Sequence, residues 1–533
     1  MTPYSDLNAS AAHFDAIQQS LDSHHIALYL FAFAIAVGIA SVLNSNSPAS
    51  KDGLFTVNKR FSWEPSYFSR LRWITNADVI MDEADIKAQG RPYRLARGDT
   101  DQIVLPVEMI PELNALGMNV LNSRESHAFG LLGHLTGMDV VRHTSFHVRV
   151  LLSYISPALP SLFALTGKRI AAGLEKEFSQ SNEWTQMKPH RAVVRCIGEA
   201  IALSLFGAEM TENNPELVHL THEHTNNVFQ VCFAMRCVPQ CLQPILVWLL
   251  PAKWRLLSGW AKFRSYVMPR VAQLKAQKKN IGSEESEPVN PDVISWMVED
   301  GRNELERDPK VLTTLVGSIA AGSTYSITNF CCRTVLDLIS HPETLKIVRE
   351  EIRQKHAEIN GQWTAADLAS LEKLESAMKE SSRLTPGTLL IYSRVVKKDH
   401  VLSNGLALKK GQFVTMSASQ RTMDPSIFED PLEYKGLRFC EDNKIEEHRA
   451  KPFSSINMDT LTWGAGRWAC PGRIITDMSA KILLVKLLDE YDFAFVGDKP
   501  LQRAIMHEFL FFHPESYMLV RRRRDSSGIV FVQ

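Results

Sequence analysis

The sequence has no excess of charge of either sign. Its 533 residues hold 59 Lys and Arg against 59 Asp and Glu, whereas proteins that bind nucleic acids neutralise phosphates with clustered basic residues. Internal repeats and low-complexity stretches are also missing, and 45% of the residues are hydrophobic and 22% charged. Such values exclude a disordered, collagen-like or coiled-coil chain. We expect a globular protein with no nucleic-acid partner.

Cysteines are scarce. The eight cysteines are Cys196, Cys232, Cys237, Cys241, Cys331, Cys332, Cys440 and Cys470. They are too few for a disulfide scaffold, and no two of them have the C-x-x-C spacing of a zinc or redox site. The sequence predicts reduced thiols, as in a body that faces the cytosol. The group from Cys232 to Cys241 lies among apolar residues and is predicted to pack in the core.

One uncharged run lies near the N-terminus. Residues 26–43, IALYLFAFAIAVGIASVL, would reach about 27 Å as a helix, close to the thickness of an endoplasmic reticulum bilayer. A cleaved signal peptide and a core helix are the alternatives. A signal peptide begins with Lys or Arg, but residues 1–25 contain neither. Basic residues follow the run, so the positive-inside rule places the N-terminus of this single-pass protein in the lumen and the rest of the chain in the cytosol. Its parts are a lumenal N-terminus (1–25), a transmembrane anchor (26–43), a linker (44–65) and a cytoplasmic body (66–533).

The body is predicted to be mainly α-helical with small β-sheets. Apolar residues recur at helical spacing through most of 110–390, and short runs near 103–107 and 389–396 favour strands. The longest helical pattern, 308–339, contains the small residues Ala320 to Ser323, which leave room beside the backbone. Residues 276–292 are polar and contain prolines, which favours a surface loop. The apolar run 245–250 fits either a segment that enters a membrane leaflet or a core segment.

The most specific local pattern is WGAGRWACPGR, residues 463–473. Its glycines permit a tight loop, and the proline after Cys470 holds the backbone so that a thiolate is presented at a fixed angle. That geometry suits a sulfur that ligates a metal. Gly464, Gly466 and Ala469 also satisfy G-x-G-x-x-A, the dinucleotide fingerprint. We reject that site because the fingerprint needs an apolar strand before it, and the residues before Trp463 are polar.

Four motifs, in this order along the chain, resemble those of the cytochrome P450 family. They are AAGST (320–324), similar to its oxygen-activation stretch; ESSR (380–383), similar to its E-x-x-R pair; PLEYKGLRF (431–439), similar to the segment whose arginine joins that pair; and the cysteine loop. The tetrapeptide E-x-x-R alone would favour an exposed ion pair. Its order with the cysteine loop favours a buried network of Glu380, Arg383 and Arg438 instead. The wider sequence, including KAQGRPYRL, looks like fungal members.

The resemblance implies the cytochrome P450 fold and a haem b cofactor, with Cys470 as the axial ligand of the iron and O2 as co-substrate. A thiolate ligand favours O–O cleavage. Thr324 would be the hydroxyl that contacts dioxygen and relays protons. Ser323 stands where many members have an acid, and it carries no charge at neutral pH, so protons would pass through hydroxyls and water.

The resemblance also implies contacts to the haem propionates. Trp468 occupies the position that usually offers Arg or His, and Arg467 stands one place earlier. Arg394 looks like a second propionate contact, and Arg149 is a further candidate from an earlier helix. Trp463 replaces the usual phenylalanine and keeps an aromatic wall beside the thiolate.

The implied function is oxygenation in the endoplasmic reticulum membrane. The protein would use O2 and two electrons to hydroxylate, epoxidise or successively oxidise a lipophilic secondary metabolite of a fungal pathway. A terpenoid or meroterpenoid is the first choice, followed by polyketide and indole-alkaloid scaffolds. Since no dinucleotide site is evident, NADPH would act only through NADPH–cytochrome P450 reductase, with cytochrome b5 as a second donor. Two alternatives stay open: rearrangement or dehydration without NADPH, and a non-catalytic haem- or sterol-binding membrane protein.

Two other clusters have simpler interpretations. His219, His222 and His224 stand at helical spacing, but polar neighbours such as Glu223 favour a solvated helix face over a metal site. The run Arg521–Arg524 favours either a solvated tail or contact with acidic lipid headgroups.

Overall fold

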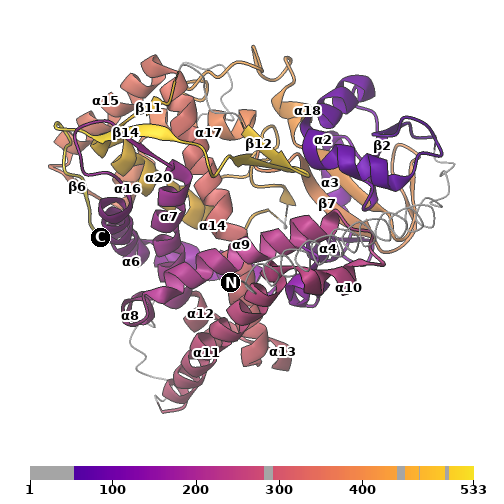
Figure 1. Cartoon of the computed structure of the whole chain (residues 1–533), viewed down its shortest axis with the longest axis horizontal. Coiled ribbons are helices and arrows are strands. Elements are labelled where there is room, and N and C mark those ends of the chain that lie inside the picture. The colour runs from indigo at the N-terminus through magenta and orange to yellow at the C-terminus, as the bar shows by residue number, and fades with distance from the viewer. Residues whose placement is uncertain (1–52, 281–291, 441–450, 467–468, 498–502) are drawn as a thin grey trace, which may run out of the picture.

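The computed structural model describes residues 53–280, 292–440, 451–466, 469–497 and 503–533 (Figure 1). The predicted lumenal segment and transmembrane anchor (1–43) and the first part of the linker (44–52) lie outside these residues. Among the described residues, one helix is long and apolar enough to cross a membrane, α6 (Phe146–Glu177). It lies far from the N-terminus and packs against α7 and α20.

Helices dominate, as the sequence predicts. The helices of the N-terminal half are α2 (Ser66–Ala88), α3 (Ile110–Ala115), α4 (Ser123–Gly130), α5 (Gly133–Thr136), α6, α7 (Pro189–Phe206), α8 (Ala208–Asn213), α9 (Glu216–Arg236), α10 (Gln243–Leu246) and α11 (Pro251–Asn280). Those that follow are α12 (Val293–Asp300), α13 (Glu304–Arg307), α14 (Pro309–Ser340), α15 (Pro342–Glu358), α16 (Ala365–Ala369), α17 (Glu372–Leu384), α18 (Ser419–Thr422) and α20 (Arg473–Glu490). Short 3-10 turns are η1 (Val107–Met109), η2 (Asp139–Arg142) and η3 (Val247–Leu249).

The strands are short. In chain order they are β1 (Thr56–Val57), β2 (Tyr93–Ala96), β3 (Asp101–Val104), β4 (Leu121–Asn122), β5 (Thr185–Met187), β6 (Gln362–Trp363), β7 (Leu390–Val396), β8 (His400–Val401), β9 (Ala407–Leu408), β10 (Phe413–Ser417), β11 (Tyr491–Phe495), β12 (Arg503–Met506), β13 (Phe509–Phe512), β14 (Met518–Arg522) and β15 (Val530–Phe531). The main sheet has the order β1-β2-β3-β10-β7-β4, and β12 and β13 form a separate hairpin. Because β1 pairs with β2, the fold begins inside the predicted linker, before residue 66.

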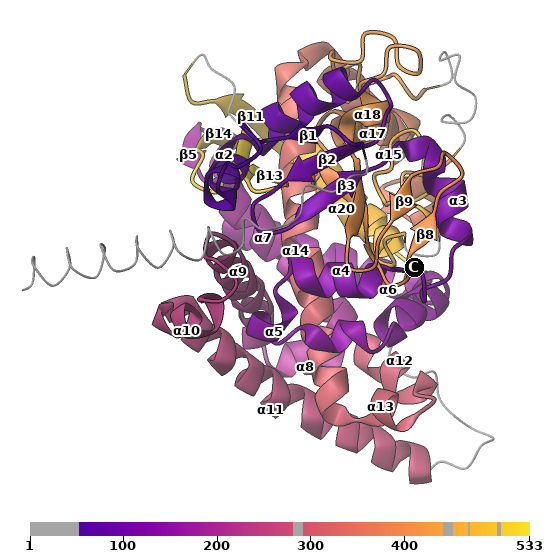
Figure 2. The ribbon, with the colours of Figure 1, turned by 90° about the vertical axis from the view of Figure 1, so that its right-hand side faces the viewer.

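Helix α14 is the central element, and Figure 2 shows it passing through the middle of the molecule. It matches the predicted helix 308–339. Asp308 caps it by accepting a hydrogen bond from the backbone N–H of Lys310, and proline fills the first position, where a missing N–H costs nothing. The helix ends before His341-Pro342. It packs against α7, α9 and α11, and against α17 and α20, so it joins the two halves of the core.

The structure changes one predicted segment and divides another whose interpretation was open. Helix α11 continues through residues 276–280 of the predicted loop, and residues 281–291 lie outside the described part. The run 245–250 forms α10 and η3 on the surface, with Ile245 69%, Trp248 48% and Leu249 76% exposed. The core interpretation holds for Val247, which is buried.

The histidine cluster is only partly solvated. His219 is exposed and His222 half-buried, but His224 is 1% exposed, since its ring packs edge-on against Trp260 and Phe263. The solvated interpretation is therefore wrong for His224. Among the described residues, no group of His, Cys, Asp or Glu is arranged to hold a metal ion.

The remaining sequence interpretations give mixed results. The eight cysteines form no disulfide. Cys232 is buried as predicted, but Cys241 is exposed, so a packing role is wrong for it. Part of the basic C-terminal run belongs to strand β14, and Arg521 and Arg523 both pair with Asp492 of β11. The run is therefore not a free tail.

Candidate active site

The cysteine loop connects to α20 through a tight backbone turn. Gly464 and Gly466 adopt positive φ angles of 73° and 65°, which favour glycine. The backbone N–H of Cys470 donates to the carbonyl of Trp463 at 2.8 Å. Burial raises the pKa of the Cys470 thiol, and the backbone N–H groups of Gly472 and Arg473, where α20 starts, lower it. A helix N-terminus stabilises an anionic sulfur, so the loop suits a thiolate that binds a metal.

A buried ion network stands behind this loop. Glu380 and Arg383, both 0% exposed, form a bidentate pair with two contacts of 2.8 Å. Arg438 adds contacts of 3.0 and 3.1 Å to the same carboxylate. The remaining guanidinium donors bind backbone carbonyls, including those of Thr422 and Glu429, so each buried charge has partners. The three residues that the sequence groups together are thus one cluster in space.

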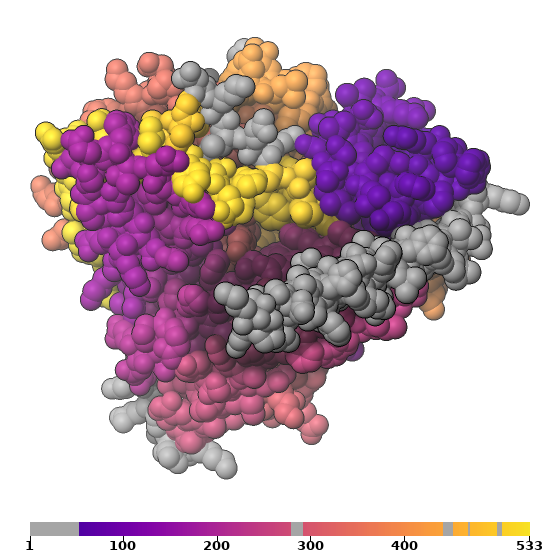
Figure 3. Space-filling view, in the orientation of Figure 1, coloured from indigo at the N-terminus to yellow at the C-terminus, as the bar shows by residue number. Residues whose placement is uncertain are grey.

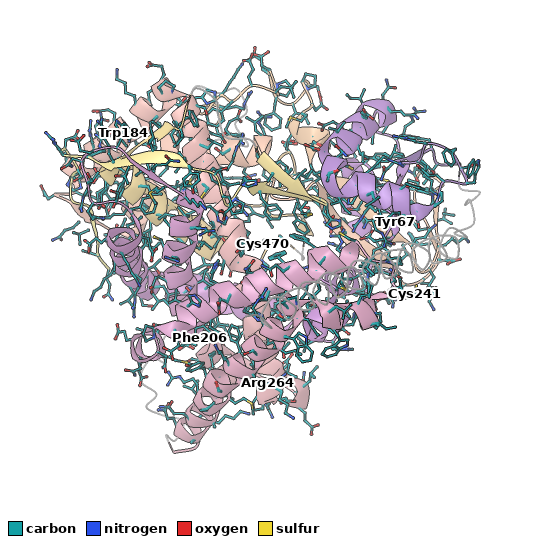
Figure 4. All side chains as sticks on the ribbon, viewed as in Figure 1. Tyr67, Trp184, Phe206, Cys241, Arg264 and Cys470 are labelled. Atoms are coloured by element: carbon teal, nitrogen blue, oxygen red, sulfur yellow. The ribbon has the colours of Figure 1, made fainter. Side chains whose placement is uncertain are left out.

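A side-chain contact joins this network to the cysteine loop. The hydroxyls of Ser382, on α17, and Thr462, just before the loop, lie 2.9 Å apart. The indole N–H of Trp463 donates to the carbonyl of Phe453 at 2.5 Å. These bonds hold the loop on the α17 side of the molecule. Figure 4 shows Cys470 near the centre of the view, in line with α14.

One stripe of α14 faces the cysteine loop. Gly322, Ser326 and Phe330 recur every four residues and so share a helix face. Phe330 stacks on Phe453 at 4.9 Å, and Phe453 meets the ring of Trp463 edge-on at 5.1 Å. Gly322 and Ser326 are exposed, and a Cβ added at Gly322 would meet no atom within 4 Å. The described chain therefore leaves open space beside this stripe, on the side of the loop.

Thr324 lies on a different face of the helix. It is 0% exposed and its hydroxyl donates to the carbonyl of Ala320. The same carbonyl accepts a hydrogen bond from Thr225 of α9 at 3.2 Å. Thr324 thus points into the packing between α14 and its neighbours. Ser323 is half-buried beside the stripe, with its hydroxyl bound to the carbonyls of Ile319 and Ala320.

Ser326 is the hydroxyl that the sequence argument missed. Its side chain donates to the carbonyls of Gly322 and Ser323, each at 2.9 Å, and it is exposed toward the open space. A usable signal existed in the sequence, since Ser326 follows Gly322 by four residues and Phe330 follows Ser326 by four. That spacing needs knowledge of which face meets the loop, which only packing provides.

Comparison with known proteins assigns the family. Residues 142–521, well over half of the chain, match the family model for cytochrome P450. The chain belongs to the cytochrome P450 family. The match covers the central helix, the ion network and the cysteine loop together. Family membership implies a haem cofactor and O2 as co-substrate.

Similar proteins are fungal cytochrome P450 monooxygenases, and they agree with the resemblance inferred from the motifs. Cytochrome P450 monooxygenase AN1598 of Emericella nidulans is 26% identical over 507 residues, which are 95% of this chain and 94% of that protein. Cytochrome P450 monooxygenase olcJ of Penicillium canescens is 26% identical over 97% of this chain and 98% of its own. Cytochrome P450 monooxygenase paxP of Penicillium paxilli is 27% identical over 83% and 84%.

The charges beside the loop fit the carboxylates of a haem. Arg394 is 6% exposed and pairs with no carboxylate among the described residues, and burial lowers its pKa to about 10. Its guanidinium lies 3.9 Å from the ring centroid of Tyr392, whose hydroxyl donates to Asn114 at 2.6 Å. The Asn114 amide in turn packs against Gly466 of the cysteine loop, since a Cβ added at Gly466 would lie 2.6 Å from the amide nitrogen. A buried cation therefore lies beside the cysteine loop, where an anionic group would complete it.

Arg149 does not fit a propionate contact. Its guanidinium binds Asp300 at 2.8 Å and Glu306 at 2.7 Å, and the hydrogen bonds to these carboxylates raise its pKa. Those partners occupy its donors on the side of α12 and α13. These contacts do not support the prediction that Arg149 binds a propionate. Arg467 and Trp468 lie outside the described residues.

Two further residues that the sequence did not suggest have ring or guanidinium nitrogens without a partner in the described part of the chain, and one of them, Arg124, follows a strand that pairs with the strand of Arg394. Among the described residues, Nδ1 of His147 and Nε of Arg124 are buried without a hydrogen-bond partner. Arg124 follows β4, which pairs with β7 next to Arg394, and its charge acts on His147. These residues are distant in sequence from the cysteine loop, so only the fold brings them together.

Proposed function

We propose that this chain is a haem-thiolate monooxygenase that oxidises a lipophilic secondary metabolite in a fungal pathway, with a terpenoid or meroterpenoid as the first choice of substrate. The observation that supports it is the cysteine loop. Cys470 is presented where α20 starts, and Trp463 of the same loop is joined through Phe453 to Phe330, on the stripe of α14 that also carries Gly322 and Ser326. Hydroxylation, epoxidation or successive oxidation would take place between the cysteine loop and this stripe.

Different residues would hold different parts of the haem. Cys470 would ligate the haem iron, Arg394 would neutralise a propionate, and Arg124 and His147 offer buried nitrogens that have no partner among the described residues. Bound haem supplies the redox-active iron at which O2 is reduced. Glu380 with its two arginines holds α17 and the segment after α18 together, which keeps the cysteine loop in place.

Ser326 would handle protons on the open side of the site. Its hydroxyl both donates and accepts, and it lies on the stripe that faces the cysteine loop, whereas Thr324 does not. Because Ser323 carries no charge, protons reach Ser326 through hydroxyls and water. Electrons come from an NADPH–cytochrome P450 reductase, with cytochrome b5 as a second donor.

The proposed location is the endoplasmic reticulum membrane, with the N-terminus in the lumen and the body in the cytosol. The uncharged run 26–43 supports an anchor. The exposed apolar side chains of Ile245, Trp248 and Leu249 form a surface patch of the kind that contacts lipid. Membrane lipid and a lipophilic substrate are thus its expected partners.

The deciding experiment is the absorption spectrum of the reduced, carbon-monoxide-bound protein. The wild type is expected to show the red-shifted Soret band of a thiolate ligand, and Cys470→Ser to lose it. Cys241→Ser changes an exposed thiol and serves as the control, which keeps the band. An unshifted band in a folded wild type would contradict the proposal and favour a haem- or sterol-binding protein.

The need for reductase distinguishes oxygenation from rearrangement or dehydration without NADPH. Substrate turnover by the wild type is expected to need NADPH, reductase and O2. Product formation without them would favour rearrangement or dehydration of an already oxygenated substrate.

A further inference from the structure

An aromatic wall stands where α9 meets the β12–β13 hairpin. Phe229 and Phe233 lie one helical turn apart, with ring centroids separated by 5.5 Å. Strand β13 alternates, so Phe509 and Phe511 share one face while Leu510 is buried on the other. The phenylalanine face of α9 contacts the phenylalanine face of β13, because the ring of Phe509 lies 5.6 Å from that of Phe233 and 6.2 Å from that of Phe229.

These four phenylalanines are half-buried rather than buried. An aromatic cluster that only filled the core would be closed to solvent. In the space-filling view the hairpin and α9 border a recess (Figure 3). The wall therefore keeps an accessible side, which a ligand can cover.

The wall extends to α14 at Tyr325. Tyr325, which precedes Ser326, meets Phe229 edge-on at 6.2 Å. The ring of Tyr325 also lies 5.7 Å from His222 of α9 and 5.7 Å from His190 of α7. The aromatic surface thus reaches α14 on the same helical turn as the hydroxyl proposed to handle protons.

The two histidines add polar atoms without charge. Burial lowers the pKa of both rings, that of His190 to about 4, so both are neutral at pH 7. Nδ1 of His222 is buried and has no hydrogen-bond partner among the described residues. A neutral imidazole suits a hydroxyl or carbonyl oxygen of an uncharged ligand.

A buried ion pair holds the wall in shape. Arg236, at the end of α9, binds Glu508 of the hairpin turn at 2.9 Å, and their side chains are 2% and 9% exposed. Glu508 directly precedes Phe509, and Arg236 follows Phe233 by three residues. The pair fixes the two aromatic faces relative to each other, so the subsite is preorganised.

We propose that this wall, formed by Phe229, Phe233, Tyr325, Phe509 and Phe511 with His222 at its edge, is the substrate subsite and binds an aromatic ring that bears an oxygen substituent. The inference rests on the proposed function and narrows its substrate class. Aromatic rings gain from offset and edge-on contacts with other rings beyond the area they bury, and a saturated ring does not. Among terpenoid-derived substrates, those that carry an aromatic moiety are therefore preferred.

The test is calorimetric binding of a matched pair of probes, 2-naphthol and decahydro-2-naphthol, to the full-length haem-loaded protein in detergent. They share a skeleton and a hydroxyl and differ in aromaticity. We expect 2-naphthol to bind at least about tenfold more tightly, from two or three ring contacts. Phe229→Leu and Phe509→Leu should each reduce that preference at least about threefold, while Phe68→Leu, on the exposed side of α2, leaves it unchanged.

The polar edge is tested with naphthalene as the third probe. The preference for 2-naphthol over naphthalene should fall at least about threefold in His222→Phe. Equal affinity for the aromatic and saturated probes, a preference that survives both leucine variants, or no binding of 2-naphthol at millimolar concentration would each overturn the proposal. Thermal melting confirms that each variant is folded. Binding heat needs no turnover, so a protein without the thiolate band would contradict the proposed function while the subsite is still judged by its own result.

Discussion

Two neighbouring hydroxyls on α14 have opposite surroundings. Ser326 is exposed on the stripe that faces the cysteine loop, and Thr324 is 0% exposed and faces packed helices. We predict that Ser326→Ala lowers product formed per NADPH by about 10²-fold, because a positioned proton donor contributes on that order, with little change in thermal stability. The measurement is the ratio of product to hydrogen peroxide.

The matched variant is Thr324→Ala, which should leave that ratio nearly unchanged. It removes a buried hydrogen bond to Ala320 and is expected to cost about 1–2 kcal/mol of unfolding free energy, seen as a lower melting temperature. The opposite pattern, with uncoupling in Thr324→Ala and none in Ser326→Ala, would show that the sequence-based choice of Thr324 was right.

His224 makes the protein sensitive to acid. Burial lowers the pKa of His224 from 6.5 to about 3. Below pH 6.5 this imidazole is therefore protonated in the unfolded chain but stays neutral in the folded protein. Stability is therefore present above pH 6.5 and is lost as the pH falls toward 3. Between pH 7 and pH 5 the loss from this one group is about 2 kcal/mol. His224→Phe should remove that part of the pH dependence.

Urea unfolding at pH 7 and pH 5 measures this pH dependence of the unfolding free energy. Other buried histidines also titrate, so the relevant quantity is the difference between the wild type and His224→Phe, with the exposed His219→Gln on the same helix as the control. An unchanged pH dependence in His224→Phe would mean that the buried ring is protonated in the folded protein.

At the scale of elements, the buried network decides whether α17 stays attached to the cysteine loop. Glu380→Ala leaves Arg383 and Arg438 buried without a carboxylate, which we expect to cost about 3–5 kcal/mol of unfolding free energy. Loss of the thiolate band at a lower denaturant concentration is the measurement. Asp399→Asn breaks an exposed pair with Lys409 and should produce no measurable change. Equal effects would show that the network is not structural.

Elements differ in how far their sequence determines them. The long apolar period predicted α14 within one residue at each end, because a helical spacing is a local signal. The run 245–250 was ambiguous, because an apolar pattern does not say what lies opposite it. Packing left Ile245 and Leu249 on the surface and placed Val247 inside.

At the scale of the whole molecule, the anchor and the exposed patch should contribute separately to membrane binding. A chain that starts at Gly53 is expected to keep its thiolate band and to be released from membranes by alkaline carbonate, which the full chain resists. In that shortened chain, replacing Ile245, Trp248 and Leu249 with serine should weaken binding to phospholipid vesicles at least about tenfold, because apolar area no longer leaves water. Vesicle sedimentation measures both steps, and a shortened chain that resists carbonate would contradict the anchor.

The sequence by itself determined the chemistry that depends on local order. The cysteine loop and the E-x-x-R pair are each formed by residues close together in the chain. The order of these motifs, with the segment that carries Arg438, resembled that of the family. Tertiary structure decided which groups face one another. Successive residues of a helix point about 100° apart, so the packing of α14 against α7 and α9 selected Ser326 over Thr324 for the open side. Carboxylates from α12 and α13 likewise occupied Arg149, and aromatic neighbours buried His224. Such outcomes depend on partners far away in sequence, and no local pattern contains them.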